Sequence, residues 1–288
     1  MSTWTLIGDG PWAQALTHRL AAGGHQITGP DTLAERIIIA VSAEALESTL
    51  RALAPRLQGN HRILTRVPGL TPDGHRPGEA VLTLTPVRQV AVLAGGATPE
   101  TIRDAKPAAV VVASAFPAWA SEIQAAFAHE TLRIYTETDH AGVELAAALA
   151  DVLGVALGVA RAVLVGPATE ATALTRAVAE MDRLVTALGG RAGTAHGLAG
   201  LGMLAELAFA GGGESFQAGA LLVQGKHAEA LARHPDLAHL AQRISERAAR
   251  QRLRAPLVDT VAALFSGRLP VKEALAGLMA RVMRSEKG

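Results

Sequence analysis

Two acidic side chains stand out because the segment that carries them, Gly142 to Ala160, is otherwise almost entirely small and apolar. Glu144 and Asp151 are seven residues apart, so a helix places them on one face. A carboxylate on a helix that must be buried usually faces a partner group, a water molecule or a substrate. The segment therefore indicates an active-site helix or a structural helix whose acids bond to neighbouring groups.

A glycine-rich loop near the N-terminus could hold a dinucleotide. The stretch LIGDGPWA ends an apolar strand and opens a helix, with the spacing Gly8-x-Gly10-x-x-Ala13. Gly8 would make the tight turn, Gly10 would let the backbone approach a pyrophosphate, and Ala13 would allow close packing of helix on strand. Pro11 suits the first helical turn. The alternative is a tight strand-to-helix turn that binds no ligand.

The adenosine side of such a site is shortened in this sequence. The second expected strand ends in ITGP, and only Asp31 is placed to bond a ribose hydroxyl. Residues 29–36 leave little room for the usual crossover before the next strand. A dinucleotide would therefore be held less completely than in an ordinary site.

The first half of the chain alternates strand-like and helix-like segments. Strands are expected over residues 3–8, 25–28, 36–41, 62–67, 81–86, 90–95, 108–114 and 132–137. Helices are expected over residues 12–24, 43–57, 98–105 and 117–128, with Ser42 as the cap of the second. This alternation predicts a mainly parallel sheet with helices on its faces.

After Asp139 the strand pattern stops, and nearly every segment has helical periodicity. We therefore predict a Rossmann-like α/β domain over residues 1–138 and an all-α domain over residues 139–288. A central position in the second domain would explain why the helix at 142–160 is apolar all round.

Composition excludes several classes of function. The net charge of +1 gives no reason to expect nucleic acid or an anionic membrane as a partner, and the absence of cysteine excludes disulfides and thiolate chemistry. The histidines have no metal-binding spacing, so no metal site is predicted. The N-terminus lacks the pattern of a signal peptide, and the apolar helix is short for a membrane span. We expect a soluble cytoplasmic protein.

The ordered motifs resemble those of the NAD(P)-dependent glycerol-3-phosphate dehydrogenase family over nearly the whole chain. GDGPWAQAL is similar to the glycine loop of the family, with Trp12 in its aromatic position. VAVLAGGATPETI, which contains Gly95, and YTETDHAGVELAAALADVLGVALG resemble later segments. The resemblance implies NAD or NADP as cofactor, with Gly8, Gly10, Pro11, Trp12, Ala13 and Gly95 as candidate binding residues. It also implies a helical domain of the 6-phosphogluconate-dehydrogenase-like C-terminal type.

The sequence departs from the family where charge is needed to reduce dihydroxyacetone phosphate. By resemblance, the two lysines of the family fall on Ala150 and Pro68, and the next position, usually Asn, is Asp151. An acidic position of the family falls on Met203 and a threonine on Leu207. The Arg-Asn pair that grips the phosphate falls at about Glu214 and Ser215. We therefore predict little or no activity on glycerol 3-phosphate.

Two functional classes remain open. One is an oxidoreductase acting on another substrate, with His140 or Asp151 as acid–base groups, although a solvated or structural role is favoured for both. The other is a non-catalytic protein that senses a nucleotide or binds partners. Arg66, His196 and Lys226 are further candidates for which surface roles are favoured, and Arg161 or Arg176 could pair with Asp151. Apolar helices in the second half leave a homodimer open as an alternative to a monomer.

Overall fold

The structure is a computed structural model of the chain, and it describes residues 1–163, 166–210 and 213–279. The chain divides into two compact units. The first contains Met1–Asp151 and Met181–Glu206, and the second contains Val152–Glu180 and the chain from Leu207 onward. By packing, the first unit thus extends beyond residue 138 into the helical half of the sequence.

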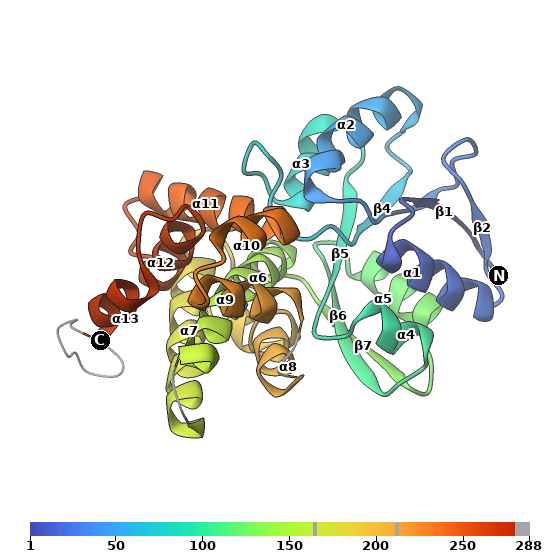
Figure 1. Cartoon of the computed structure of the whole chain (residues 1–288). Coiled ribbons are helices and arrows are strands. Elements are labelled where there is room, and N and C mark those ends of the chain that lie inside the picture. Colours follow the sequence, from blue (N-terminus) through green and yellow to red (C-terminus); the bar gives the residue numbers. More distant parts are fainter. Residues whose placement is uncertain (164–165, 211–212, 280–288) are drawn as a thin grey trace. The chain divides into compact units, whose positions relative to one another are not determined.

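The first unit is built on a seven-stranded sheet (Figure 1). Its strands are β1 (Thr3–Ile7), β2 (Gln26–Thr28), β3 (Arg36–Ile39), β4 (Arg62–Thr65), β5 (Gln89–Ala94), β6 (Ala108–Ser114) and β7 (Leu132–Glu137). Their order is β2-β1-β3-β4-β5-β6-β7, and only the β5–β6 pair is antiparallel. The predicted mainly parallel sheet is confirmed.

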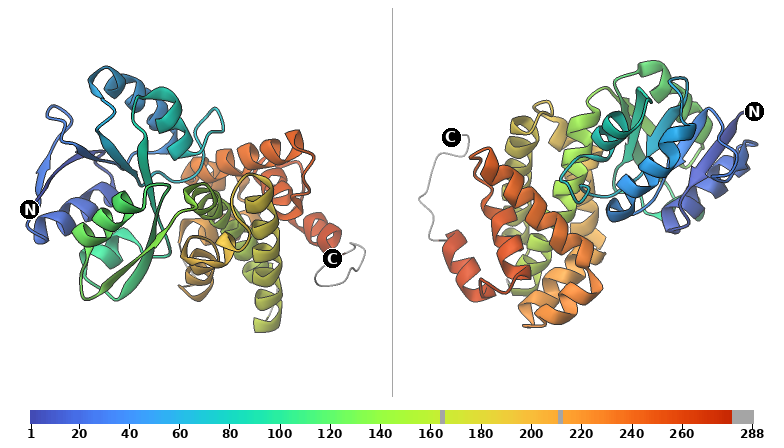
Figure 2. Two further views of the ribbon diagram at one scale, coloured as in Figure 1. Left: turned by 180° about the vertical axis from the view of Figure 1, so that it is seen from behind. Right: turned by 90° about the horizontal axis from the view of Figure 1, so that it is seen from above.

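Helices cover both faces of this sheet (Figures 1 and 2). On one face lie α1 (Pro11–Ala22), α4 (Pro99–Arg103) and α5 (Pro117–Phe127), which share a core with Trp4 and Trp119. On the other face lie α2 (Ala43–Leu53) and α3 (Pro77–Leu84), which pack on the isoleucines of β3. Ser42 caps α2 as predicted, since its side chain accepts a hydrogen bond from the backbone N–H of Ala45.

The strand predicted over residues 81–86 is wrong, because residues 81–84 form the end of helix α3 and Thr85 is its C-cap. Pro77 fixes the first helical turn, and the Glu79 carboxylate accepts a 3.4 Å hydrogen bond from the backbone N–H of Arg76. Pro77, Ala80 and Val81 are buried at helical spacing. The capping signals at the start of α3 therefore outweigh the alternating pattern of VLTLT.

Among the described residues, only helices follow β7. They are α6 (His140–Val163), α7 (Pro167–Ala187), α8 (Met203–Ala210), α9 (Glu214–Val223), α10 (His227–Arg233), α11 (Pro235–Arg250), α12 (Pro256–Phe265) and α13 (Val271–Met279). Short turns of 3-10 or π-helix lie at Ala54–Arg56, Thr194–His196 and Leu198–Gly202. In the second unit, Glu180 of α7 accepts hydrogen bonds from the N–H groups of Leu257 and Val258 and so caps α12.

Helix α6 is long and apolar enough to cross a membrane by length and composition alone. However, 83% of its most apolar window is buried inside the structure. This burial is typical of the core helix of a globular protein, and it explains why the helix has no polar face.

Candidate functional site

The sheet topology indicates where a ligand would bind, namely at the carboxyl ends of the central strands. The chain leaves β1 to form β2 on one side and then β3 on the other, so the strand order reverses between β1 and β3. In open parallel sheets, ligands bind beyond the carboxyl ends of the strands at such a reversal. The glycine loop follows β1 at this point, and Arg66 follows β4 at the same edge.

The two glycines of the loop differ in what the fold demands of them. Gly8 has a φ of +125°, and a Cβ there would lie 2.2 Å from the carbonyl oxygen of Ala40. Gly10 has a φ of −69°, and a Cβ there would meet nothing within 4 Å. The fold alone therefore requires Gly8, whereas nothing in the fold requires Gly10. A pyrophosphate needs such open space to come close to the backbone at Gly10.

The start of α1 offers backbone donors at this loop. Gly10 is the cap residue and has no side chain to satisfy the first N–H groups, and the first turn carries no acid. Pro11 opens the helix, and Ala13 is fully buried against the sheet. Such a helix start favours an anion. Farther along the sheet edge, Gly95 has a φ of +131°, and a Cβ there would lie 3.1 Å from the Cα of Val110.

The connection between β2 and β3 is short. Residues 29–35 form a loop and not a helix, and this loop lies against β1. The Thr5 hydroxyl accepts a 2.7 Å hydrogen bond from the N–H of Ala34 and donates to the carbonyl of Thr32. Arg56 donates to the carbonyls of Pro30 and Asp31, and the Asp31 side chain is exposed.

A contact that the sequence did not reveal joins the glycine loop to the rest of the site. The guanidinium of Arg66 lies over the ring of Trp12, with 4.0 Å between its central carbon and the ring centroid. Arg66 is therefore partly buried, and the surface role favoured from the sequence is wrong. Burial lowers the pKa of Arg66 to about 10, while the nearby Asp151 carboxylate acts in the opposite direction. The group stays charged at neutral pH.

Asp151 therefore has Arg66 as its nearby cation. Arg161, one of the partners suggested by the sequence, instead donates to Glu170 through two nitrogens at 2.6 and 3.1 Å. Asp151 and Arg66 are 85 positions apart in sequence; Asp151 lies in α6, whereas Arg66 follows β4. Only the folded chain brings them together.

Glu144 is committed to structural bonds. Its carboxylate accepts a 2.6 Å hydrogen bond from the N–H of Gly78 and a 3.1 Å ion-pair contact from Arg76. Burial raises its pKa to about 7, against the opposing effects of Arg76 and Gly78. These bonds agree with the backbone-bonding role that was the alternative to an active-site acid.

His140 begins α6, partly buried, and its Nδ1 atom is enclosed with no hydrogen-bond partner. Burial, followed by the positive charge of Arg76, lowers its pKa below the usual value. The ring is therefore neutral near pH 7 and is not a ready proton donor. The neighbouring Asp139 accepts hydrogen bonds from the N–H groups of Gly142 and Arg191 and from the hydroxyl of Thr194.

A narrow cavity of about 20 Å³ lies within the first unit, and it has room for roughly one water molecule. Of the residues that line it, Arg66 is the only cation and Glu144 and Asp151 are the acids. The other lining residues are apolar or glycine: Val67, Pro68, Gly69, Pro77, Val92, Leu93, Ala94, Ala147 and Met203. The cavity thus holds little net charge with which to bind a dianion.

Six of the positions that the resemblance paired with charged or polar residues can be placed in the structure, and four of them hold apolar residues. Ala150 is fully buried, Pro68 is exposed and Met203 lines the cavity. In the second unit, Leu207 is partly buried, Glu214 is exposed and Ser215 is buried. The remaining candidates are exposed: His196 lies 3.7 Å from Asp182, and Lys226 lies 3.8 Å from Glu229.

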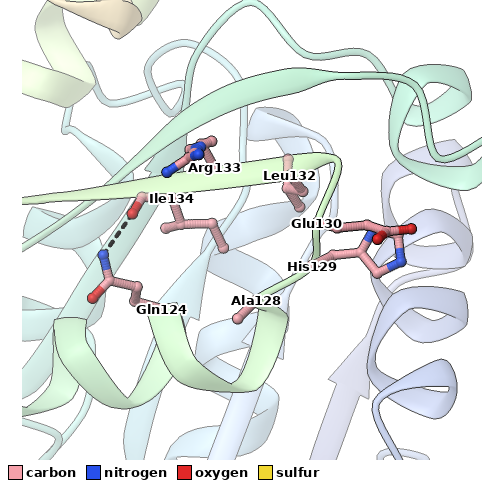
Figure 3. A pocket seen from close by; sticks show the side chains of 7 residues that line it. All are labelled: Gln124, Ala128, His129, Glu130, Leu132, Arg133 and Ile134. Atoms are coloured by element: carbon pink, nitrogen blue, oxygen red, sulfur yellow. Dashed lines mark hydrogen bonds between the residues drawn. The ribbon is translucent and has the colours of Figure 1, made fainter.

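A larger hollow lies beside β7 and α5, and its charged side chains, Glu130 and Arg133, are exposed (Figure 3). It is lined by Gln124, Ala128, His129, Glu130, Leu132, Arg133 and Ile134. Gln124 donates to the carbonyl of Ile134, and His129 bonds Thr131, so these polar groups serve the local fold. The glycine loop is not part of this hollow.

Comparison with known proteins identifies the family. Residues 139–276 match the family described as NAD-dependent glycerol-3-phosphate dehydrogenase C-terminus. A glycerol-3-phosphate dehydrogenase [NAD(P)+] of Gloeobacter violaceus is 33% identical, with 98% of each chain covered. The chain belongs to the glycerol-3-phosphate dehydrogenase family. The resemblance seen in the sequence is thereby confirmed.

Members of the glycerol-3-phosphate dehydrogenase family also share its fold. The enzyme from Coxiella burnetii superposes with a TM-score of 0.87 at 22% identity, covering 97% of this chain and 99% of the other. The enzyme from Plasmodium falciparum gives a TM-score of 0.85 at 10% identity, covering 99% and 96%. The predicted Rossmann-like sheet followed by a helical half is confirmed.

Proposed function

We propose that the chain is a divergent family member that binds NAD or NADP through its glycine loop and has little or no activity on glycerol 3-phosphate. The observation that carries the first part is the placement of Gly10, which has open space around it and lies between β1 and the start of α1, where the strand order reverses. The relatives are described as NAD(P)+ enzymes, which favours the same cofactors here.

The loss of activity is inferred from the cavity. A phosphate-bearing ketone needs a cation at its developing alkoxide and further cations at its phosphate. Arg66 is the only cation lining the cavity, and Asp151 offsets its charge. Burial and the charge of Arg76 lower the pKa of His140, so it is protonated less often than a free histidine and is a poorer cation for the alkoxide. The cavity therefore lacks a strong cationic donor for the alkoxide, and it lacks the cations that would bind the phosphate.

We assign the cofactor to residues 1–138 and a substrate or dimerisation role to residues 139–288. Gly8, Gly10, Pro11, Trp12, Ala13 and Gly95 form the proposed cofactor set. The burial of α6 and the near-zero net charge support a soluble cytoplasmic protein with no nucleic acid or membrane partner. A homodimer stays a proposal.

The experiment is a calorimetric titration of the protein with NADH and NADPH, run beside two glycine variants. Gly10→Ala and Gly59→Ala each place a methyl where nothing lies within 4 Å and φ is not positive, so both should fold. Only Gly10→Ala should weaken dinucleotide binding, by about tenfold or more, because its methyl blocks backbone approach. Equal affinities for the two variants would contradict the cofactor assignment.

A second candidate function is a pseudoenzyme that binds no dinucleotide and acts through protein partners. The narrowness of the cavity favours it, since the cavity has room for roughly one water molecule. Absence of binding at millimolar NADH and NADPH would select this alternative. Tight binding with NADH oxidation by a non-phosphorylated ketone would instead select an oxidoreductase with a changed substrate.

A further inference from the structure

A cluster of metal-ligating side chains lies outside the proposed cofactor site. Glu47 projects from α2, and Asp73 and His75 come from the loop that precedes α3. One ligand atom from each of the three residues lies within 4.8 Å of the other two. The sequence spacing of 47, 73 and 75 matches no metal motif, so the sequence did not predict this cluster.

One atom of the cluster lacks the partner that its burial demands. The Oε1 atom of Glu47 is fully enclosed and accepts no hydrogen bond from the residues that the structure describes, although the side chain as a whole is 14% exposed. His75 Nδ1 lies 3.7 Å from this oxygen, within ion-pair range but too far for a hydrogen bond. An enclosed carboxylate oxygen without a donor is costly unless a cation meets it.

The basic residue next to the cluster is engaged elsewhere. Arg76 follows His75 directly, but its guanidinium contacts Glu144 at 3.1 Å and Glu79 at 3.6 Å. The carboxylates of Glu47 and Asp73 and the ring of His75 therefore lie close together, and Arg76 forms its ion pairs with other carboxylates. This arrangement concentrates negative charge around one small volume.

The separations suit a coordinated ion. A point equidistant from three atoms no more than 4.8 Å apart lies at most about 2.8 Å from each, whereas zinc bonds to nitrogen and oxygen are about 2.0–2.2 Å. The remaining difference is well under 1 Å, and the exposed side chain of Asp73 is free to rotate by that amount. Three protein ligands leave a fourth position for water, which is a common zinc arrangement.

We propose that Glu47, Asp73 and His75 form a binding site for Zn²⁺. One imidazole nitrogen with two carboxylates favours a borderline transition metal over Mg²⁺, which prefers oxygen ligands alone. The ion would tie α2 to the loop at residues 70–75. The loop is already tightened by hydrogen bonds between His75 and Thr71, so the ligands from it are held on a compact turn.

The site has a consequence for the neighbouring elements. His75 precedes Arg76, and Arg76 holds Glu144 of α6 and stands at the start of α3. Pro68 and Gly69, in the same connection between β4 and α3, line the narrow cavity. Zinc bound at the cluster would therefore stiffen the segment that forms one wall of that cavity.

The test is titration of the untagged, metal-free full chain with ZnCl₂ by calorimetry. The expected result is one zinc per chain. His75→Ala and Glu47→Gln should each weaken binding by about tenfold or more, because each loses one of three ligands. His18→Ala removes an exposed histidine elsewhere and serves as the matched control. MgCl₂ in about hundredfold excess should leave the zinc affinity unchanged.

A second readout separates binding from folding. Zinc should raise the thermal midpoint of the wild type and of His18→Ala but not of His75→Ala, since a ligand bound only by the folded state stabilises it. Asp73→Asn changes an exposed side chain and should fold normally while losing zinc affinity. Zinc binding that is unchanged in His75→Ala and Asp73→Asn, or no binding to the wild type, would overturn the proposal.

Discussion

Arg66 is a charged side chain that the fold partly buries. Two different neighbours, an aromatic ring and a carboxylate, hold it in place. The guanidinium of Arg66 lies over the indole of Trp12, and Asp151 supplies the opposite charge. The first contact suits arginine in particular, because its planar cation stacks on aromatic rings. Through Arg66, Trp12 at the glycine loop is in contact with the segment that follows β4 and is electrostatically linked to Asp151 of α6.

Replacing Arg66 by methionine should therefore affect both stability and the glycine loop. The stacking contact is worth about 0.5–2 kcal/mol, and the change leaves Asp151 without that cation. We expect a lower urea midpoint, altered Trp12 fluorescence and weaker NADH binding. Arg51→Met, on the exposed side of α2, is the control and should change none of these. Wild-type behaviour of Arg66→Met in all three measurements would show that the contact is incidental.

Glu144 makes stability depend on pH in a direction that is unusual for a carboxyl group. Its folded pKa is raised to about 7, above the ordinary 4.5, because burial disfavours the ionised form. The folded chain therefore holds this proton more tightly than the unfolded chain. Between pH 4.5 and 7 the free energy of unfolding should fall as pH rises, by about 3 kcal/mol in total from this group.

Glu144→Gln removes this titration while keeping an oxygen for the N–H of Gly78. Urea unfolding at pH 5 and pH 8 should show the wild type losing stability relative to the variant over that interval. Glu214→Gln, an exposed control, should follow the wild-type curve. Parallel curves for wild type and Glu144→Gln would mean that the carboxylate is ionised throughout this range.

At the scale of elements, local signals account for most of the strands and helices. The β-branched run at residues 36–39 forms a strand buried in the sheet, and Ser42 caps α2. The exception is α3, where VLTLT reads as a strand but Pro77 and Glu79 start a helix. A short alternating run is ambiguous by itself, so the capping residues that precede it decide its structure.

Ser42 and Ser48 allow a matched test of capping on α2. The Ser42 side chain accepts from the N–H of Ala45, whereas the Ser48 hydroxyl donates to a carbonyl within the helix. Ser42→Ala should lower the free energy of unfolding by about 1 kcal/mol. Ser48→Ala should be neutral or slightly stabilising because alanine is the better helix former. Chemical denaturation of both variants decides this, and equal effects would contradict the capping role.

At the scale of the whole molecule, the glycine loop was predictable because its parts are adjacent in sequence. Gly8, Pro11 and Ala13 follow one strand and open one helix, so their spacing alone predicts the strand-to-helix turn. The contact of Trp12 with Arg66 and the link from Arg66 to Asp151 were not predictable, since they join residues 54 and 85 positions apart. The cluster of Glu47 and His75 was missed for the same reason.

The last prediction concerns catalysis by the whole chain. Dihydroxyacetone phosphate should not measurably accelerate NADH oxidation by this protein, because several charged groups are replaced and losing even one such group costs about 10²–10³ in rate. Ala150→Lys should not restore the reaction. Ala150 has no exposed surface, so the lysine must displace neighbours, and the phosphate still lacks its cations.

Steady-state assays of the wild type and Ala150→Lys, beside the Gloeobacter violaceus relative as positive control, check this prediction. A lower thermal midpoint for Ala150→Lys is expected in the same experiment, since burying an ammonium group is costly. Activity gained through this single change would mean that a phosphate site survives elsewhere in the chain. In that case the loss of activity relative to the family would come from the side chain at position 150 and not from changes throughout the site.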